Sequence, residues 1–517
     1  MSYIPVVARL DDVTPIPGAD RIVAATASGF RVVVGNDHKN GELGVVFPSE
    51  GVIDLDFALA AELLREHPIT GEKLSGYLDN PARVRCLTLR GVRTEALWIP
   101  IDVVLTALRS VLASRGWTNA HRLDSLADGD ILTLVVCTNA EGSPTAFEVA
   151  RKYVAPPVFV RSGGGKSPGL SERERANRAA LNALVPEHYE TSRIQVQVHK
   201  FPPGALVRAT DKYHGESGRC GKKAMPERLG RLKRAANRVA SWFGKQAFDP
   251  HVVVTGTRRT IFLHERPSAK DPPNMRRNVA EWLAPRLRPG EVIYYELVGF
   301  HASGKPIQVQ RPRDKGAESR ALKKQWGETI VYAYGCDPQG EPIQPGRPYP
   351  VNTHAPTRVG EIVTLRKPMH RIIAYRITQD GQELPFELMR QRALEIGVEV
   401  PRVRDVWRHA PPADYRPDPY ATPEELAIAA QRAACKETIR RAVTLAEGPT
   451  GILPDPLDPS HPFEGVVLRV DMRDSLGTDH IVAKCKGHGF GLLEGYARDR
   501  GDRDPEDAGP DDVPDEM

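Results

Sequence analysis

The sequence predicts an α+β protein in which an N-terminal β-barrel precedes a larger mixed domain. Residues 1–155 contain several short β-branched runs bounded by turn residues, with one helical stretch. Residues 191–497 mix strand-like runs and helical stretches without regular β–α alternation, which favours α+β over a doubly wound sheet. The 517 residues, 40% hydrophobic and 26% charged, suffice for about two to four domains with real cores.

The N-terminal domain, residues 1–155, is expected to be an OB-type barrel. The runs Phe30–Val34 and Leu43–Phe47 flank a turn-rich loop that contains Asn40-Gly41, a pattern that predicts a β-hairpin. The sequence predicts two further strands and one helix, at Val84–Leu89, Ile131–Val136 and Phe57–Glu66. Several short strands with one helix fit a small barrel, and the OB-fold is the most economical interpretation.

A linker, residues 156–190, is expected next. It leads into the second domain and contains a Gly-, Ser- and Pro-rich stretch at Arg161–Glu174. Gly165-Lys166-Ser167 matches the end of a phosphate-binding loop, but Val160 stands where that loop needs its first glycine, so a linker is favoured.

In the second domain, residues 191–497, both element types are expected. Strand-like runs occur at Ala205–Thr210, Val252–Val254, Val292–Tyr295, Thr329–Tyr334 and Val466–Val470, and helical stretches at Pro226–Phe243 and Pro423–Leu445. Residues 498–517 are rich in Pro, Gly and acids and predict a disordered acidic tail.

The charge distribution predicts an anionic partner. The net charge of +5 combines −7 over Asp499–Met517, from nine acids and two arginines, with +12 over the remainder (5 + 7). The six cysteines contain no C-x-x-C pair, which argues against a zinc ribbon and for a reducing cytoplasm. No apolar run approaches the ~18 residues of a membrane helix, and no membrane partner is expected.

Five motifs follow one another along the second domain. They are Lys212-Tyr-His-Gly215, Tyr294-Tyr-Glu-Leu-Val-Gly299, Val331-Tyr-Ala-Tyr334, Phe463-Glu-Gly-Val-Val-Leu-Arg469 and Ile481-Val-Ala-Lys-Cys-Lys486. In this order they resemble the motifs of the covalent nucleotidyltransferases, the superfamily of DNA ligases, RNA ligases and mRNA capping enzymes. The resemblance implies an ATP-grasp-like ligase domain of antiparallel sheets with flanking helices.

The chemistry of that superfamily suits these residue types. Lys212, followed by Gly215, would attack the α-phosphate of ATP and form a lysyl–AMP adduct. A bound metal, together with Lys484 and Lys486 on one face of a strand, would neutralise phosphate charge and depress the pKa of Lys212. Glu464 would hold Mg²⁺ or Mn²⁺, and Glu296 would bind the ribose hydroxyls or the metal.

The aromatic motif is expected to supply the residue that stacks on adenine. Tyr332 or Tyr334 would do this, with Tyr332 favoured, although buried tyrosines are by default core residues.

Flanking segments narrow the resemblance to one branch of RNA ligases. They are Val13–Ile22, Leu184–Thr191, Val254–Arg258 and Asp458–Gly465. This branch carries its OB domain before the catalytic domain and seals 3′-OH/5′-phosphate nicks in duplexes with an RNA 3′-OH strand. The chain departs from many relatives at His214, where they have an aspartate that contacts metal-bound water. An ATP-dependent DNA ligase and a non-catalytic OB-fold RNA-binding protein remain the alternatives.

RNA contacts are expected at two places. Arg258 is carried over from the resemblance as a contact to the nucleotide phosphate or the nicked strand, with a structural salt bridge as the alternative. Arg231, Arg234 and Arg238 lie on a basic stretch that would contact phosphates of RNA or a nicked duplex, unless it is only a solvated helix face. We expect a monomer.

Overall fold

A five-stranded antiparallel sheet forms the first part of the protein. The computed structural model describes residues 3–119, 123–154, 172–225, 229–243, 245, 247–257, 261–263, 275–314, 316–350, 367–472 and 480–501. Arg258, the Gly165–Ser167 segment and residues 502–517 of the expected tail lie outside these ranges.

The N-terminal sheet curls into a nearly closed barrel. Its strands, in spatial order, are β3 (Phe30–Gly35), β2 (Ile22–Ala27), β1 (Val6–Pro15), β4 (Leu43–Pro48) and β8 (Ala96–Pro100). Its two edges meet where the amide of Glu95 donates to the carbonyl of Arg31 at 3.1 Å. Phe30, Val32 and Val34 alternate inward into an apolar interior, as a half-buried strand requires.

The expected hairpin between Phe30–Val34 and Leu43–Phe47 is wrong, although both runs are strands. β3 pairs with β2, whereas β4 pairs with β1 and β8. The loop at Asn40-Gly41 reverses the chain, but β2 and β1 lie between β3 and β4 in the sheet.

Helices and short strands cover the other side of this sheet. α1 (Leu55–Ala60) and α2 (Ile101–Ser114) share a core with the sheet, and α1 is shorter than the helix expected over Phe57–Glu66. The remaining strands are β5 (Gly51–Ile53), β6 (Leu87–Leu89), β7 (Val92–Thr94), β9 (Thr118–Asn119), β10 (Leu134–Thr138), β11 (Pro144–Glu148) and β12 (Ala150–Lys152).

Two further sheets, almost wholly antiparallel, build the second part. The six-stranded sheet contains β17 (Ile261–Leu263), β16 (His251–Thr257), β15 (Glu216–Ala224), β18 (Glu291–Gly299), β21 (His370–Gln379) and β22 (Gln382–Glu383). The five-stranded sheet contains β13 (Ser192–Arg193), β25 (Ile481–Lys486), β24 (Gly465–Val470), β14 (Leu206–Lys212) and β23 (Val403–Arg408). Only β13 and β25 run parallel among these described pairs.

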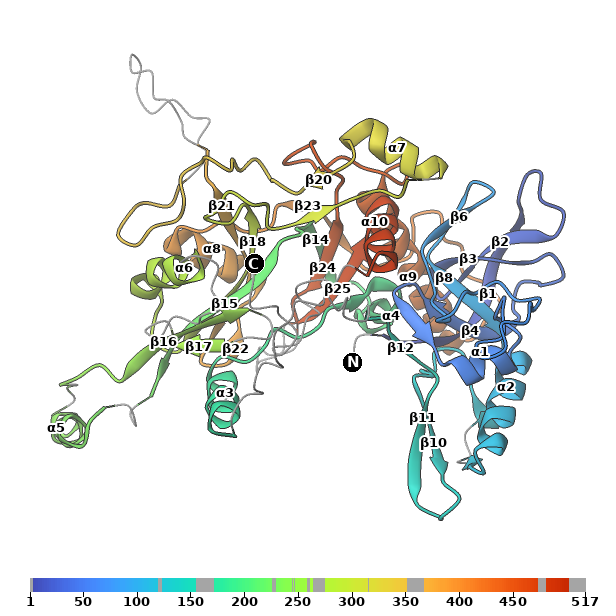
Figure 1. Cartoon of the computed structure of the whole chain (residues 1–517), viewed down its shortest axis with the longest axis horizontal. Helices are drawn as coiled ribbons and strands as arrows, with labels where there is room; N and C mark the ends of the chain where they lie inside the picture. Colours follow the sequence, from blue (N-terminus) through green and yellow to red (C-terminus); the bar gives the residue numbers. More distant parts are fainter. Residues whose placement is uncertain are drawn as a thin grey trace.

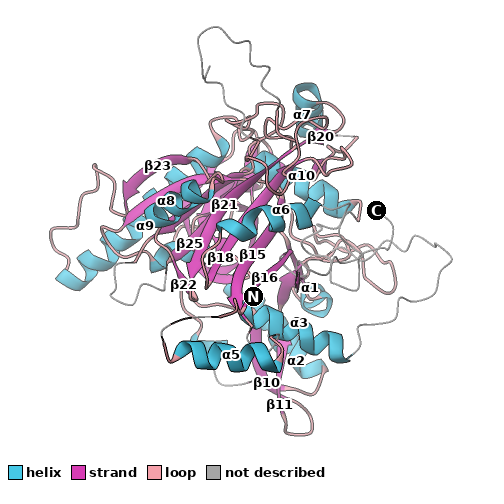
Figure 2. Ribbon diagram, turned by 90° about the vertical axis from the view of Figure 1, so that its left-hand side faces the viewer, coloured by secondary structure: helices cyan, strands magenta, loops and turns pink. Residues whose placement is uncertain are grey.

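Helices flank both sheets (Figure 2), which confirms the α+β prediction. α6 (Met275–Leu283) and α8 (Phe386–Ile396) pack on the six-stranded sheet, and α9 (Pro423–Glu447) packs on the five-stranded one. α9 begins at a capping box, in which Thr422 accepts from the amide of Glu425 and the Glu425 side chain accepts in return.

The other helices connect or extend these layers. They are α3 (Glu172–Leu184), α4 (Ile194–Gln197), α5 (Arg231–Ser241), α7 (Ala317–Trp326) and α10 (His488–Asp499). α3 occupies part of the expected linker, and α10 extends into the first residues of the expected tail. Of the expected strand over Thr329–Tyr334, only β20 (Ile330–Val331) forms, paired with β19 (Val309–Gln310).

Buried ion pairs join the N-terminal barrel to the second part. The two terminal nitrogens of Arg31, Nη2 and Nη1, donate to the carboxylate of Glu447 at the end of α9, at 2.6 and 2.8 Å. Arg83 Nη1 lies 2.6 Å from Asp499 of α10. In Figure 1 the barrel lies at one end of the molecule and α5 at the other. No described helix is long and apolar enough to cross a membrane.

Candidate active site

A cavity of about 200 Å³ lies between the two sheets of the second part. Lys212, at the end of β14, contributes to its wall together with Glu464, Lys484 and Lys486 of the five-stranded sheet region. Glu296 of β18 lines it from the six-stranded sheet. Four of the five motifs therefore meet at one cavity, although more than 270 residues separate Lys212 from Lys486 in the chain (486 − 212 = 274).

Lys212 is held by the backbone register of its sheet. Lys212 pairs with Gly465 of β24, and Gly465 pairs in turn with Lys486 of β25. Gly465 has φ 142, and a Cβ there would lie 2.1 Å from the carbonyl of Cys485, so this position requires glycine.

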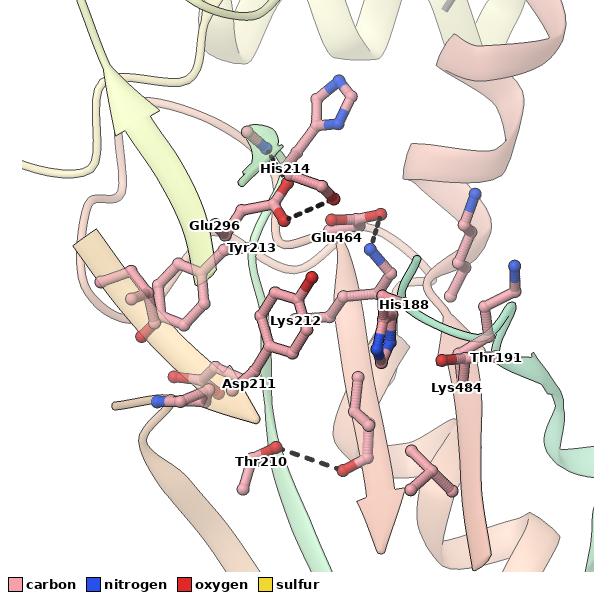
Figure 3. A pocket seen from close by; sticks show the side chains of 18 of the residues that line it. His188, Thr191, Thr210, Asp211, Lys212, Tyr213, His214, Glu296, Glu464 and Lys484 are labelled. Carbon is pink, nitrogen blue, oxygen red and sulfur yellow. Dashed lines mark hydrogen bonds and ion pairs between the residues drawn. The ribbon is translucent and has the colours of Figure 1, made fainter. Parts of the chain in front are cut away.

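The side chain of Lys212 is paired with a buried carboxylate. Its Nζ lies 2.8 Å from Oε1 of Glu464, whose side chain is 3% exposed (Figure 3). Burial is the largest single influence and lowers the pKa of Lys212, but the charges of Glu464 and Glu296, together with the hydrogen bond to Glu464, leave that pKa above its ordinary value. Lys486 lowers this pKa, as expected, but it does not by itself offset the two carboxylates.

Glu464 also offers a donor atom for a cation. Its Oε2 is buried and has no hydrogen-bond partner among the described residues. Divalent Mg²⁺ and Mn²⁺ prefer oxygen ligands, and an unpartnered buried carboxylate oxygen fits that need. No group of three or more His, Cys, Asp or Glu side chains in the described ranges forms a complete protein cage. Phosphate oxygens or water would complete the coordination.

Glu296 fixes the turn that follows Lys212. Its Oε1 accepts from the amide of Gly215 at 2.9 Å, and its Oε2 accepts from the hydroxyl of Ser217 at 3.2 Å. Gln308 donates to the carbonyl of Gly215 at 2.8 Å. A Cβ on Gly215 would lie 2.4 Å from the carbonyl of Leu297, which explains the glycine of the first motif. A carboxylate has about four acceptor positions, so Glu296 can still accept bonds from a ligand.

Lys484 and Lys486 both line the cavity, as alternation along β25 predicts. Lys486 lies 2.7 Å from Glu494 of α10, and no carboxylate of the described ranges forms an ion pair with Lys484. Burial first, and then the neighbouring Lys486, lowers the pKa of Lys484 to about 8. Lys484 is therefore a cation that can lose its charge near neutral pH.

The structure corrects the expectation for Tyr332. Its side chain is fully buried, donates to Oε1 of Gln310 at 2.6 Å, and does not line the cavity. Tyr334 is also fully buried, and its hydroxyl accepts from the amide of His214 at 2.7 Å. Both tyrosines support the loop after Lys212 from behind, where they cannot stack on a nucleotide in the cavity.

A different tyrosine reaches the cavity. Tyr375 lies on β21, beside the strand that carries Glu296, and its ring lies 4.9 Å from that of His188. Tyr375 belongs to none of the five motifs, and only the pairing of β18 with β21 brings it to this wall. His188 and Thr191 also line the cavity, and they come from the Leu184–Thr191 segment that the sequence analysis singled out.

His214 lies against the core side of the site. Its ring packs edge-on against Tyr332 and Phe490, with centroids 4.8 and 5.0 Å apart, and burial lowers its pKa. These ring contacts order the loop between Lys212 and Gly215.

The basic helix α5 lies away from the cavity. In the chain it connects β15 to β16, and in space it lies at the end of the molecule opposite the barrel (Figure 1). Arg231, Arg234 and Arg238 are exposed, and the helix buries no residue. Four apolar side chains at this tip are also exposed: Leu232, Val239, Trp242 and Phe243.

Comparisons with known proteins give one group of similar structures. No protein-family model and no curated protein matches the chain. The fold is similar to solved structures of an RNA ligase from Naegleria gruberi. A mutant of that ligase with ATP and Mn gives a TM-score of 0.47 at 14% identity, covering 96% of this chain and 99% of that one. A second mutant with AMP and Mn gives 0.45 at 15% identity, with coverages of 96% and 99%. The ligase with PPi gives 0.42 at 14% identity, again with coverages of 96% and 99%.

Proposed function

We propose that this protein is an ATP-dependent RNA ligase that works through a lysyl–AMP intermediate. The observation that carries the proposal is the placement of Lys212, Glu464, Lys484 and Lys486 around one cavity, with Glu296 on the facing sheet. A lysine amine next to a metal-binding carboxylate and two further cations suits attack on a nucleoside triphosphate.

The first step would join Lys212 to AMP. The neutral amine of Lys212 attacks the α-phosphorus, a P–N bond forms, the P–O bond to pyrophosphate breaks, and the amine proton passes to solvent. Glu464 raises the pKa of Lys212, so a cation that draws away this carboxylate frees the amine. A bound Mg²⁺ or Mn²⁺ at Glu464 would supply that charge and stabilise negative charge on the phosphate.

The remaining residues would bind and orient the nucleotide. Lys484 and Lys486 face the developing charge on the α-phosphate, and Tyr375 takes the stacking role that was expected of Tyr332. Glu296 accepts from the ribose hydroxyls while it holds the turn at Gly215.

Two further steps would complete the ligation. AMP passes from Lys212 to the 5′-phosphate of a polynucleotide, and an RNA 3′-OH then displaces AMP and closes the phosphodiester at a nick in a duplex. In this proposal the N-terminal barrel is an OB-type domain, the protein acts as a monomer in the cytoplasm, and the arginines of α5 contact duplex phosphates. The barrel order β3-β2-β1-β4-β8 supports the OB-type assignment, and the exposure of α5 supports its contact with phosphates.

Covalent labelling tests the first step. Incubation with α-labelled ATP and a divalent ion should give a labelled protein that Lys212→Ala no longer forms. Glu464→Ala and Lys486→Ala should lose most of the label. Label that persists in Lys212→Ala would overturn the mechanism.

Nick sealing then separates the proposal from its alternatives. Duplexes with an RNA 3′-OH should be sealed and those with a DNA 3′-OH should not. Equal sealing of both would favour a DNA ligase. Tight, salt-sensitive RNA binding without any adduct would favour a non-catalytic RNA-binding protein.

A further inference from the structure

One carboxylate of the N-terminal barrel domain lines the cavity of the second part. Glu50 lies in the turn between β4 and β5, and its side chain is only 14% exposed. Its carbonyl accepts from the amide of Tyr153 at 2.8 Å, which fixes the turn. No sequence motif of the second domain includes this residue.

A single oxygen of Glu50 faces two cations. Oε1 of Glu50 lies 3.2 Å from Nη2 of Arg193 on β13 and 3.4 Å from Nζ of Lys486 on β25. The same Nη2 of Arg193 also donates to the hydroxyl of Ser49 at 2.9 Å. Ser49 and Glu50 of the barrel domain therefore hold the guanidinium of Arg193 beside β25.

The carboxylate of Glu50 lies among three neighbouring cations. Lys484, Lys486 and Arg193 are crowded into a buried region, where like charges repel strongly because little water screens them. The carboxylate of Glu50 lies among them and counters this repulsion. It also raises the pKa of Lys484, against the larger lowering by burial and by Lys486.

The backbone of Glu50 has a conformation that its side-chain contacts help to offset. Its φ is 80, in the left-handed region that favours glycine. Such a conformation costs free energy in a residue with a side chain, and it persists where other contacts compensate. Glycine would fit the turn better, but it would remove the contacts to Arg193 and Lys486.

We propose that Glu50 is a positioning residue for lysyl–AMP formation, through which the barrel domain sets the placement and charge of Lys486 and Arg193. The inference rests on the proposed ligase function. Without the Glu50 side chain, Lys486 keeps only its ion pair with Glu494, at 2.7 Å, among the described residues. Arg193 then loses its ion pair with Glu50.

Three full-length variants test this role. Glu50→Gln keeps the size of the side chain and removes the charge, and it should slow lysyl–AMP formation at least tenfold. Glu50→Gly removes the same charge but relieves the left-handed backbone, so it should form the adduct as slowly as Glu50→Gln while regaining part of the stability lost with the ion pairs. Glu62→Gln is the matched control, because Glu62 is an exposed glutamate of the same domain with φ 55.

The pH profile separates positioning from a general loss of structure. Without Glu50, Lys484 should lose its proton at lower pH, so the alkaline decline of adduct formation should move to lower pH in Glu50→Gln and stay in place in Glu62→Gln. Adduct formation by Glu50→Gln at the wild-type rate and with the wild-type profile would overturn the inference and leave the ligase proposal intact. A wild-type protein that forms no adduct would overturn the ligase proposal itself.

Discussion

The Nζ atom of Lys212 lies 2.8 Å from Oε1 of Glu464, so the expected nucleophile and the expected metal ligand neutralise each other. In the proposed mechanism, this pair favours the protonated form of Lys212 until a cation competes for the carboxylate. Metal binding and activation of the nucleophile would then be coupled in one contact.

This coupling predicts that Glu464→Gln lowers the pKa of Lys212. The carboxylate is the largest influence that raises this pKa, whereas burial and Lys486 both lower it. Carbon-13 NMR of reductively methylated protein, with Lys212→Arg to assign the signal, measures the change. Adduct formation should nevertheless fall, because the metal ligand is lost. An unchanged pKa in Glu464→Gln would show that the ion pair does not control Lys212.

The lowered pKa of Lys484 predicts that the reaction with ATP becomes less efficient at alkaline pH. Its pKa is lowered to about 8, so it is charged below that pH and neutral above it. The kcat/KM for ATP should decline above about pH 8, because a neutral Lys484 no longer attracts phosphate. The profile of kcat should decline at higher pH, since bound phosphate stabilises the charged lysine.

Lys484→Arg provides the control for that limit. A guanidinium keeps its charge throughout this pH range, so the decline near pH 8 should disappear even if the overall rate is lower. A decline that persists in Lys484→Arg would assign it to another group.

Tyr375 and Tyr332 should respond to substitution in opposite ways. Tyr375→Ala removes a ring from the cavity wall and should raise the KM for ATP about 5- to 150-fold, from the ~1–3 kcal/mol that stacking on one base contributes. Tyr332→Phe leaves the buried Oε1 of Gln310 without its donor and should cost about 1–3 kcal/mol of stability, with little change in that KM. Urea unfolding and initial-rate kinetics on both variants distinguish the two roles.

The arginines of α5 should contribute to the salt dependence of duplex binding. Replacing Arg231, Arg234 and Arg238 by Gln should flatten the slope of log K against log salt by about 2 to 3, if each contacts one phosphate. Self-adenylylation should stay intact, because the helix lies away from the cavity.

A matched triple variant controls for net charge. Arg65, Arg151 and Arg288 are exposed arginines that pair with nearby acids, and their replacement by Gln should leave the slope nearly unchanged. Equal changes of the salt slope in the two triple variants would show that α5 is only a solvated helix face that does not contact the duplex.

The ion pair between the two parts should stabilise the protein. Arg31→Met leaves the carboxylate of Glu447, 2% exposed, with only Arg93 at 3.1 Å, and should cost about 3 kcal/mol. Arg65→Met, which breaks an exposed pair, should cost less than about 1 kcal/mol. Urea unfolding followed by tryptophan fluorescence measures both, and equal costs would contradict a structural role for the Arg31 pair.

The sequence predicted the gathering of the motif residues better than it predicted strand pairing. Lys212, Glu464 and Lys486 lie at the ends of strands of one sheet, so their motifs converge when the sheet forms. The turn-rich loop before Leu43 signals a chain reversal, but local residues do not determine which strand becomes the partner. The same limit hid Tyr375, whose place depends on the pairing of β21 with β18.

Two other residues lay beyond the reach of local patterns. Tyr332 occurs in a run that suits a nucleotide site and a core equally, and its burial depends on the packing of His214 and Phe490. Glu50 looks like an ordinary turn residue, because its contacts form only when the barrel meets β13 and β25.

Gly465 pairs through its backbone with Lys212 on one side and Lys486 on the other. The spacing of the two lysines is therefore determined by main-chain hydrogen bonds, and it should not change when either side chain is replaced. Such a scaffold is suited to redesign: a different nucleophile or a different cation could be introduced at these two positions, and each would emerge from the sheet at the place the lysine now occupies.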